Sequence, residues 1–145
     1  MSTGDIELDW HHGVRPGLTG EAEEQVTPEL TVSHRLPGMP SVYTTPNMIY
    51  LMEIACANAI HPHLPPGWTS LGVGVNIRHL AATPVGARVR AQARIVEVTQ
   101  RIVTCEVTAH DGLRLIGQGT HSRAPVDQAD FERSVLAQAS QVGAS

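Results

Sequence analysis

The 145-residue sequence has no lysine and is poor in aromatic residues, cysteine and positive charge. Ten arginines against fourteen acidic residues give a net charge of −4, which is no electrostatic footprint for nucleic acid binding. Aromatic residues make up 3% of the chain, so we expect a core of Val, Ile, Leu, Ala and Met. The length fits one domain with a sizeable core.

Further absences bear on location and chemistry. The first residues lack the basic segment and apolar run of a secretion signal, and the most apolar segment, residues 46–60, is too short to span a bilayer. We therefore expect a cytoplasmic protein without membrane contact. Cys56 and Cys105 lie among apolar neighbours and are expected to be reduced core residues. No metal or cofactor is expected, because the histidine pairs at 11–12 and 61–63 have unspecific spacing.

The first part of the chain shows a change of pattern near residue 26. Residues 1–25 are acidic, contain spaced glycines and show no sustained periodicity, which predicts a flexible N-terminal arm. From Thr27 onward, Leu30, Val32 and His34 alternate with polar residues as in a short strand. We expect the folded domain to cover residues 26–140.

Residues 46–60 are predicted to form the central helix of the domain. Thr44 and Thr45 are suitable N-cap residues, and Pro46 suits a first helical turn. Apolar residues fall on nearly every side, which indicates a helix surrounded by protein. Glu53 interrupts this apolar surface. A desolvated carboxylate costs several kcal/mol unless it is paired, protonated or open to a cleft, so Glu53 is either a functional acid or a marginal residue paired with an arginine.

The segment 71–79 alternates with period two and predicts a strand. Its odd positions, including Ile77 and His79, form one apolar face, which only the helix at 46–60 could cover. The pattern therefore places His79 opposite Glu53. Gly72 and Gly74 would let a ligand or another backbone approach the strand closely.

Three more alternating runs and a helix complete the predicted order. The runs lie at 89–95, 103–109 and 113–119, and residues 127–139 are predicted to be a short helix. The turn at Asp111-Gly112 favours a hairpin. We expect an α+β hot-dog fold, in which an antiparallel five-stranded sheet wraps around one central helix. Because a single sheet would leave an open edge, we also expect a homodimer with the two sheets joined side by side.

Several of these residues resemble the hot-dog thioesterases of the fluoroacetyl-CoA thioesterase type. The similar features are Thr45-Pro46, Glu53 eight residues after Thr45, and the segments 76–86 and 116–121, within a match over roughly residues 26–131. The resemblance implies hydrolysis of an acyl-CoA substrate to the acid and free coenzyme A. It also implies a catalytic set of Thr45, Glu53 and His79, with Gly72 close to the acyl group.

The resemblance is incomplete in the segment before the helix. Fluoroacetyl selectivity in this family is associated with a phenylalanine lid there, whereas this chain has Met39, Val42 and Tyr43. Met39 and Tyr43 are therefore the candidate substrate-binding residues of that segment. We expect a short or small acyl group and leave its identity open.

The expected chemistry assigns His79 as the proton acceptor and Glu53 as the group that orients it. Thr45 is either the nucleophile or the residue that holds the attacking water or the thioester carbonyl. Eight helical residues separate the Thr45 and Glu53 backbones by about 12 Å, so the acyl group or a second subunit would have to bridge them. His34, His110 and His121 have no comparable support. Six arginines could bind coenzyme A, with none singled out: 78, 88, 90, 94, 114 and 123.

Two other functions are compatible with the fold. An enoyl-CoA hydratase or dehydratase would also use a histidine and an acid, but these usually lie together on one segment, and no Asp lies close to His79. A protein that binds acyl groups or small hydrophobic molecules without turnover would not need the full set of Thr45, Glu53 and His79.

Overall fold

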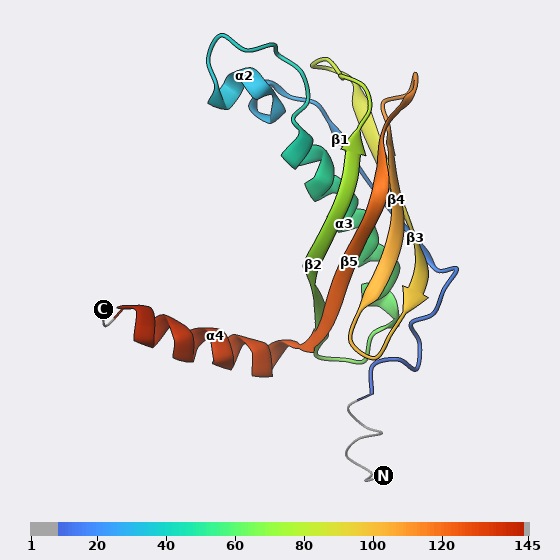
Figure 1. Cartoon of the computed structure of the whole chain (residues 1–145), viewed down its shortest axis with the longest axis vertical. Helices are drawn as coiled ribbons and strands as arrows, with labels where there is room; N and C mark the ends of the chain where they lie inside the picture. The colour runs from blue at the N-terminus through green and yellow to red at the C-terminus, as the bar shows by residue number, and fades with distance from the viewer. Residues whose placement is uncertain (1–8, 144–145) are drawn as a thin grey trace.

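The structure, a computed structural model, describes residues 9–143 and shows one antiparallel sheet curled around a long helix (Figure 1). In this part of the chain the sheet has five strands in the order β1-β3-β4-β5-β2. The strands are β1 (Thr19–Gln25), β2 (Trp68–His79), β3 (Arg88–Val98), β4 (Val103–His110) and β5 (Leu115–Asp127). The helices are α2 (Val32–Arg35), α3 (Thr45–Ile60) and α4 (Gln128–Gly143), with 3-10 turns η1 (Pro28–Leu30) and η2 (His61–His63). This is the predicted hot-dog architecture.

The central helix α3 confirms the predicted helix at 46–60. The Thr44 side chain caps it by accepting a hydrogen bond from the Asn47 backbone N–H at 3.1 Å, and Pro46 lies in the first turn. The helix packs its inner face on the sheet, where burial of each large apolar side chain contributes roughly 1.5–3 kcal/mol. Its buried residues are Met48, Leu51, Met52, Ala55, Cys56, Ala59 and Ile60.

One side of α3 is not covered by its own chain. Tyr50 is 63% exposed and Ile54 is 38% exposed. The expectation of a helix surrounded by protein on all sides is therefore wrong for a single chain. Exposed apolar residues on a central helix point to a second surface that covers them.

The strand β1 replaces part of the predicted flexible arm. Thr19–Gln25 pair with β3, and Glu23 forms ion pairs with Arg88 at 3.1 Å and Arg90 at 3.3 Å. At Gly20 a Cβ would lie 2.3 Å from the Ala55 carbonyl oxygen, so glycine is needed where α3 crosses the strand. The arm prediction is wrong for 19–25, and the buried Trp10 and Val14 extend the folded unit upstream of residue 26. Residues 1–8 of the predicted arm lie outside the described residues.

The prediction of a short strand from Thr27 onward is also wrong. This segment forms η1 and α2 instead (Figure 1). The Thr31 hydroxyl donates to the Pro28 carbonyl at 2.7 Å, a local bond that competes with strand pairing. Only an isolated bridge joins Thr31 to Tyr43 among the described residues.

The strand β2 confirms the predicted strand at 71–79, but the helix does not cover all of the apolar face predicted for it. The register with β5 shifts between Gly72 and Gly74, so a bulge changes which side chains face the helix. Leu71, Val73 and Val75 are 36%, 57% and 50% exposed, whereas Ile77 and His79 are partly buried. In the described chain β2 pairs with β5 alone and forms an open edge of the sheet.

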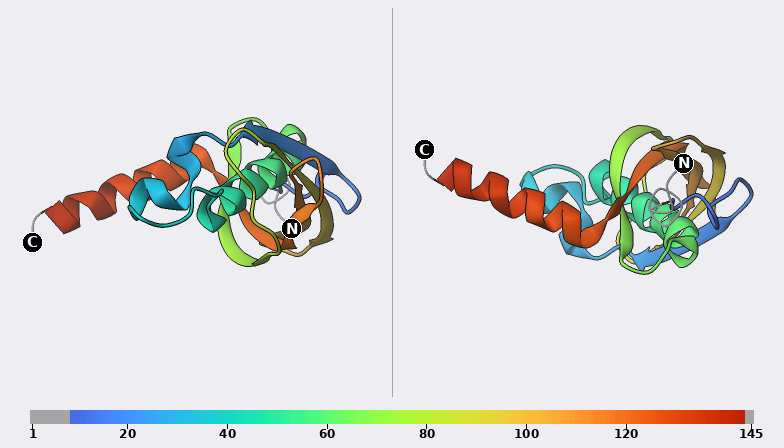
Figure 2. Two further views of the ribbon diagram at one scale, coloured as in Figure 1. Left: turned by 90° about the horizontal axis from the view of Figure 1, so that it is seen from above. Right: turned by 90° about the horizontal axis from the view of Figure 1, so that it is seen from below.

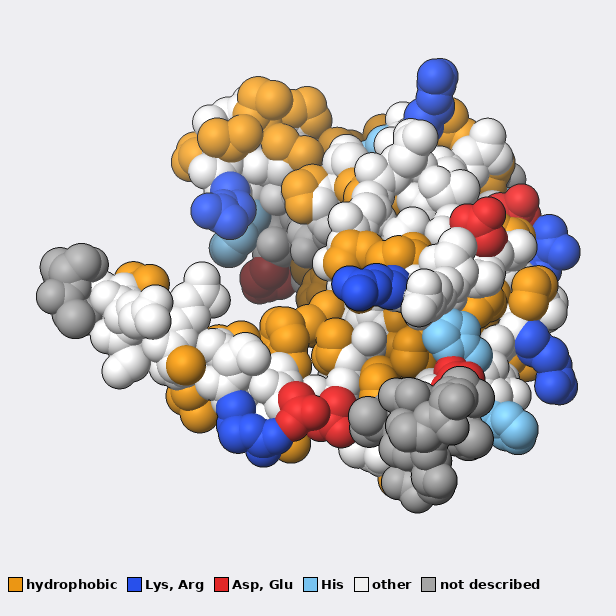
Figure 3. Space-filling model, turned by 60° about the horizontal axis from the view of Figure 1, so that its bottom comes forward, with side chains coloured by type: hydrophobic (Ala, Val, Ile, Leu, Met, Phe, Trp, Pro, Cys, Tyr) orange, Lys and Arg blue, Asp and Glu red, His pale blue; other side chains and the backbone are white. Residues whose placement is uncertain are grey.

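The helix α4 confirms the predicted C-terminal helix and projects away from the rest of the molecule (Figures 1 and 2). It begins where β5 ends, and the Gln128 N–H donates to the Gly67 carbonyl at 3.0 Å. None of its sixteen residues is buried. Apolar side chains gather on the face of the body beside α4 (Figure 3). Within residues 9–143, no helix is long and apolar enough to cross a membrane.

Candidate active site

Thr45 and His79 meet at the N-terminal end of α3. Because Thr44 is the N-cap, the Thr45 hydroxyl is not needed to cap the helix and lies 2.7 Å from Nδ1 of His79 at the end of β2. Burial lowers the pKa of His79, and the nearby backbone of Ala81 opposes this shift. A neutral imidazole with its proton on Nε2 can accept the Thr45 proton at Nδ1. The pair can therefore work as a hydroxyl and its general base.

Two further observations describe the surroundings of this pair. The Nε2 atom of His79 is buried and has no hydrogen-bond partner in residues 9–143. A pocket of about 400 Å³ opens beside the pair. It is lined by Val32, Val42, Tyr43, Thr45, His79, Leu80, Ala81 and Ala82.

Tyr43 and Met39, the substrate-binding residues predicted in the segment before α3, differ in their position relative to this pocket. Tyr43 lines this pocket but is 1% exposed, and its hydroxyl donates to Glu24. Burial and the hydrogen bond with Glu24 raise the pKa of Tyr43. Met39 is 49% exposed and is not part of the pocket lining.

Glu53 lies two turns further along α3, with different neighbours. Its Oε1 is 3.9 Å from Nε2 of His121, and its side chain is 30% exposed. At Gly72 a Cβ would lie 2.8 Å from Oε1 of Glu53, so glycine leaves space for the carboxylate. Among the described residues no hydrogen bond or ion pair joins Glu53 to His79. The expected contact of these two side chains is therefore absent within one chain, while Gly72 does lie at the acid.

Polar side chains on the inner face of β5 complete the surroundings of Glu53. His121 is fully buried and Arg123 is 9% exposed. Arg123 donates from Nε to the Ser70 hydroxyl and from Nη2 to the Ser70 carbonyl, both at 2.7 Å. Its Nη1 lies 3.1 Å from Nε2 of His121. The Ser70 hydroxyl lies 2.7 Å from Nε2 of His61.

The sequence analysis does not single out this polar cluster: His121 has no support there, and Arg123 is one of six candidate arginines for coenzyme A. The alternation of β5 is a signal for the cluster, because it puts both residues on the inward side with Gly117, where a polar side chain is unusual. The structure therefore has two polar centres along α3, Thr45–His79 at its start and Glu53–His121–Arg123 in its middle.

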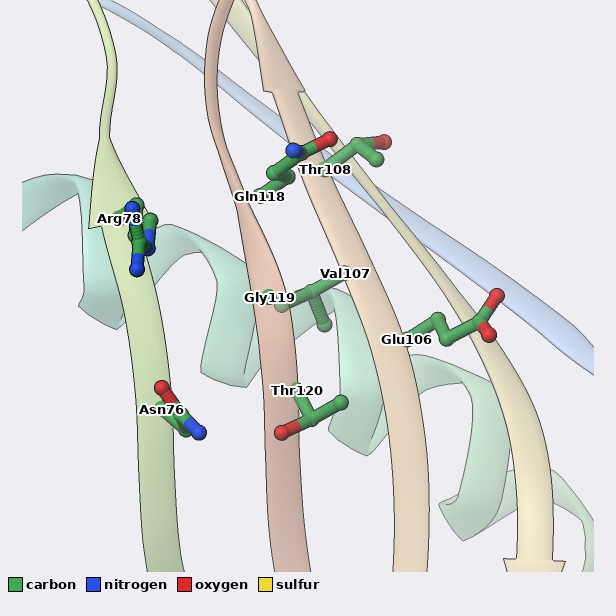
Figure 4. A pocket seen from close by; sticks show the side chains of 8 residues that line it. All are labelled: Asn76, Arg78, Glu106, Val107, Thr108, Gln118, Gly119 and Thr120. Carbon is green, nitrogen blue, oxygen red and sulfur yellow. The ribbon is translucent and has the colours of Figure 1, made fainter.

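The cysteines and the outer face of the sheet lie outside these centres. Cys56 and Cys105 are free and buried, as expected, and their mutual hydrogen bond together with burial raises the pKa of Cys56. In residues 9–143 no group of His, Cys, Asp and Glu could hold a metal ion. A pocket of about 420 Å³ on the outer face of the sheet contains none of the predicted catalytic residues (Figure 4). Its polar residues are Asn76, Arg78, Glu106, Thr108, Gln118 and Thr120.

Comparisons with known proteins show the family of this chain. Residues 26–129 match the family model of the fluoroacetyl-CoA-specific thioesterase. The fluoroacetyl-CoA thioesterase of Streptantibioticus cattleyicolor is 39% identical over 129 residues, which are 85% of this chain and 93% of the relative. A structure of the fluoroacetyl-CoA thioesterase FlK has a TM-score of 0.79 and 38% identity, covering 86% of this chain and 97% of that chain.

A second solved structure extends the likeness. A thioesterase superfamily member from Thermus thermophilus has a TM-score of 0.84 and 32% identity, covering 92% of this chain and 99% of that one. The family model covers well over half of the chain, and the curated relative exceeds 30% identity over most of its length. The chain belongs to the family of fluoroacetyl-CoA-specific thioesterases.

Proposed function

We propose that the protein hydrolyses the thioester of a short or small acyl-CoA to the free acid and coenzyme A. The observation that carries this proposal is the 2.7 Å contact between the Thr45 hydroxyl and His79 Nδ1, in a chain of a thioesterase family. A hydroxyl bonded to a neutral imidazole is the arrangement that nucleophilic or general-base hydrolysis requires.

The reaction begins when His79 takes a proton at Nδ1. Either the Thr45 oxygen attacks the thioester carbonyl, or Thr45 holds a water that does so. The carbonyl oxygen becomes negative in the tetrahedral intermediate, and backbone N–H groups at the start of α3 are candidate donors to it. The C–S bond then breaks, and the protonated His79 returns its proton to the leaving thiolate. If Thr45 is the nucleophile, a water molecule cleaves the resulting ester in a second round.

Glu53 enters the same site through a homodimer. The open edge of β2, with exposed Val73 and Val75, and the exposed Tyr50 and Ile54 of α3 are the surfaces proposed to meet the second subunit. Two β2 strands related by a twofold axis run antiparallel, so the end of one strand lies beside the beginning of the other. This pairing would bring Glu53 of the partner subunit toward His79.

In that dimer each remaining site residue has a proposed role. Gly72 leaves space for the acyl group beside Glu53 of its own chain. Tyr43 forms a fixed wall of the Thr45–His79 pocket, and the exposed Met39 covers the bound acyl group from the preceding loop. Because no phenylalanine is present in that loop, the fluoroacetyl group of the relatives is one candidate among small acyl groups. A FlK variant has been crystallised with fluoroacetate and coenzyme A, which supports coenzyme A as the carrier. A cytoplasmic location stays a prediction of the sequence.

The test is release of free thiol from a panel of acyl-CoAs: short, halogenated, branched and aromatic. We expect wild type to cleave one class of these and His79→Ala to lose that activity. His110→Ala is the matched control, because His110 is an exposed histidine at the end of β4. If no thioester is cleaved but one binds tightly, the non-catalytic binding function replaces this proposal.

A further inference from the structure

Arg123 is a buried cation whose guanidinium is held by neutral groups. Within residues 9–143 no carboxylate lies within ion-pair distance of it, and it is 9% exposed. All three of its nitrogen atoms donate: Nε and Nη2 to the hydroxyl and carbonyl of Ser70, and Nη1 to Nε2 of His121. Burying a charge without an ion-pair partner costs free energy, so we expect the fixed position of the Arg123 guanidinium to have a role.

Ser70 can hold Arg123 in this way only if its own proton points elsewhere. The Ser70 oxygen accepts from Arg123 Nε, and its proton is directed to Nε2 of His61, 2.7 Å away. The Ser70 backbone N–H also points to that nitrogen, at 3.2 Å. Because His61 Nε2 accepts in both contacts, His61 must be neutral with its proton on Nδ1. The neutral ring thus sets the orientation of the Ser70 hydroxyl.

The same hydrogen bonds define the protonation of His121. Its Nδ1 lies 2.8 Å from the Gly74 carbonyl, which can only accept, so Nδ1 carries a proton. Its Nε2 faces an N–H of Arg123 and must therefore be an unprotonated acceptor. His121 is a neutral Nδ1–H imidazole, although the Glu53 carboxylate lies 3.9 Å from Nε2 and would otherwise favour a second proton there.

We propose that Arg123, fixed by Ser70 and His61, is a positioning residue that keeps His121 neutral and so leaves the Glu53 carboxylate free of an ion pair. The inference deepens the proposed function, because it rests on a role for Glu53 in acyl-CoA hydrolysis. Without Arg123, a protonated His121 would pair with Glu53 and weaken it as a base or as an orienting group for His79.

The other groups around His121 do not replace Arg123. Glu53 and Cys56 face the cluster from α3, Cys105 is the register partner of His121 on β4, and β2 offers the Gly74 carbonyl. The Cys56 and Cys105 thiols are buried and hydrogen-bonded to each other. Burial has the largest effect and lowers the pKa of His121, whereas the hydrogen bond to the Gly74 carbonyl raises it. Arg123 adds to the lowering, and Glu53 opposes it. Arg123 is the positive charge that acts against protonation.

The direct test is nitrogen NMR of the His121 ring in the full-length protein, which reports the tautomer independently of turnover. At neutral pH we expect wild type to keep the neutral Nδ1–H form. Arg123→Met should raise the His121 titration midpoint, because the nearby positive charge is lost. Arg94→Met is the matched control for the NMR titration, because Arg94 is an exposed arginine paired with Glu106 on the outer face, and it should leave the His121 titration unchanged.

A second pair of variants tests the same inference if Arg123→Met fails to fold. Ser70→Ala removes the hydroxyl but keeps the carbonyl contact, so we expect a smaller shift of the same sign. Ser70→Thr retains a hydroxyl and should restore the wild-type titration. If the His121 ring is protonated at Nε2 in wild type, or titrates identically in all these variants, the inference is wrong.

Kinetics separate this inference from the proposed function. Arg123→Met should lower kcat about tenfold while KM changes little, since the Glu53 carboxylate is weakened as an acid–base or orienting group and no substrate-binding surface is lost. A changed His121 titration with unchanged kcat would contradict the link to Glu53. If wild type shows no turnover on any thioester, the proposed function fails, yet the NMR result still decides the His121 protonation.

Discussion

The two polar centres along α3 are built in different ways. Thr45 and His79 lie at the ends of their elements, and their contact is a single hydrogen bond beside an open pocket. Glu53 lies in the middle of the helix, beside a buried network that joins η2, β2 and β5. In our proposal the first centre moves a proton and the second fixes the charge of an acid. The proposed site needs both centres, and a single chain keeps them apart.

Alanine variants of the adjacent Thr44 and Thr45 test the first centre, and they have the largest expected effect on kcat. Thr45→Ala should lower kcat on the order of a hundredfold and leave the free energy of unfolding nearly unchanged, because its hydroxyl meets His79. Thr44→Ala should do the reverse, costing about 1 kcal/mol of stability because the helix loses its cap. Steady-state kinetics and urea unfolding of both variants give the comparison. Equal effects of the two variants on kcat would remove Thr45 from the catalytic set.

Gly72 tests the second centre. In Gly72→Ala the new Cβ would lie 2.8 Å from Glu53 Oε1 and 3.1 Å from His121 Cε1, so the carboxylate must move. We expect kcat to fall about tenfold, since general acid–base groups need close positioning. Gly74→Ala is the matched control, because its Cβ would meet only Ser122 atoms at 3.5 Å or more. A fall of the same size in both variants would indicate damage to the strand rather than to Glu53.

The stability of the two centres should respond to acid in the same direction. Burial lowers the pKa of His61, His79 and His121 in the folded protein. The unfolded chain therefore binds more protons than the folded one below about pH 6.5, and the free energy of unfolding falls as the pH drops through that range. Urea titrations between about pH 7.5 and 5 measure this slope.

Comparison of variants assigns part of the slope to the second centre. His61→Gln should reduce the slope, because a histidine whose pKa is lowered in the folded protein is removed. A wild type whose stability rises with acid over this range would contradict the neutral histidines in both centres.

The two elements that carry the first centre could be predicted from the sequence because their signals are local. A capped helix start and a period-two strand ending in His79 predict the helix and the strand, but the pattern pairs His79 with Glu53. The role of Thr45 comes from the family resemblance, and its contact with His79 is seen only in the structure. The strand β1 was not predicted because its inward positions include the small residues Gly20 and Ala22, and its outward Glu23 pairs with Arg88 and Arg90 far along the sequence. Such pairing leaves no local periodicity.

The second centre and the exposed face depend on tertiary contacts. His121 and Arg123 acquire their roles only when β5 lies beside β2 and brings them to Ser70. The bulge at Gly72–Gly74 changes the facing of β2 residues, which strict alternation could not show. The family match over residues 26–129 confirms the resemblance drawn from the segments at 76–86 and 116–121.

The central claim is that His79 of one subunit and Glu53 of the partner subunit share a site, and complementation tests it most directly. His79→Ala and Glu53→Gln, each inactive alone, are mixed under conditions that exchange subunits. Half of the dimers are then mixed, and each mixed dimer has one site with both residues intact, so about a quarter of wild-type activity should return. If both residues act within one subunit, every site keeps a defect, and no activity returns although mixed dimers form.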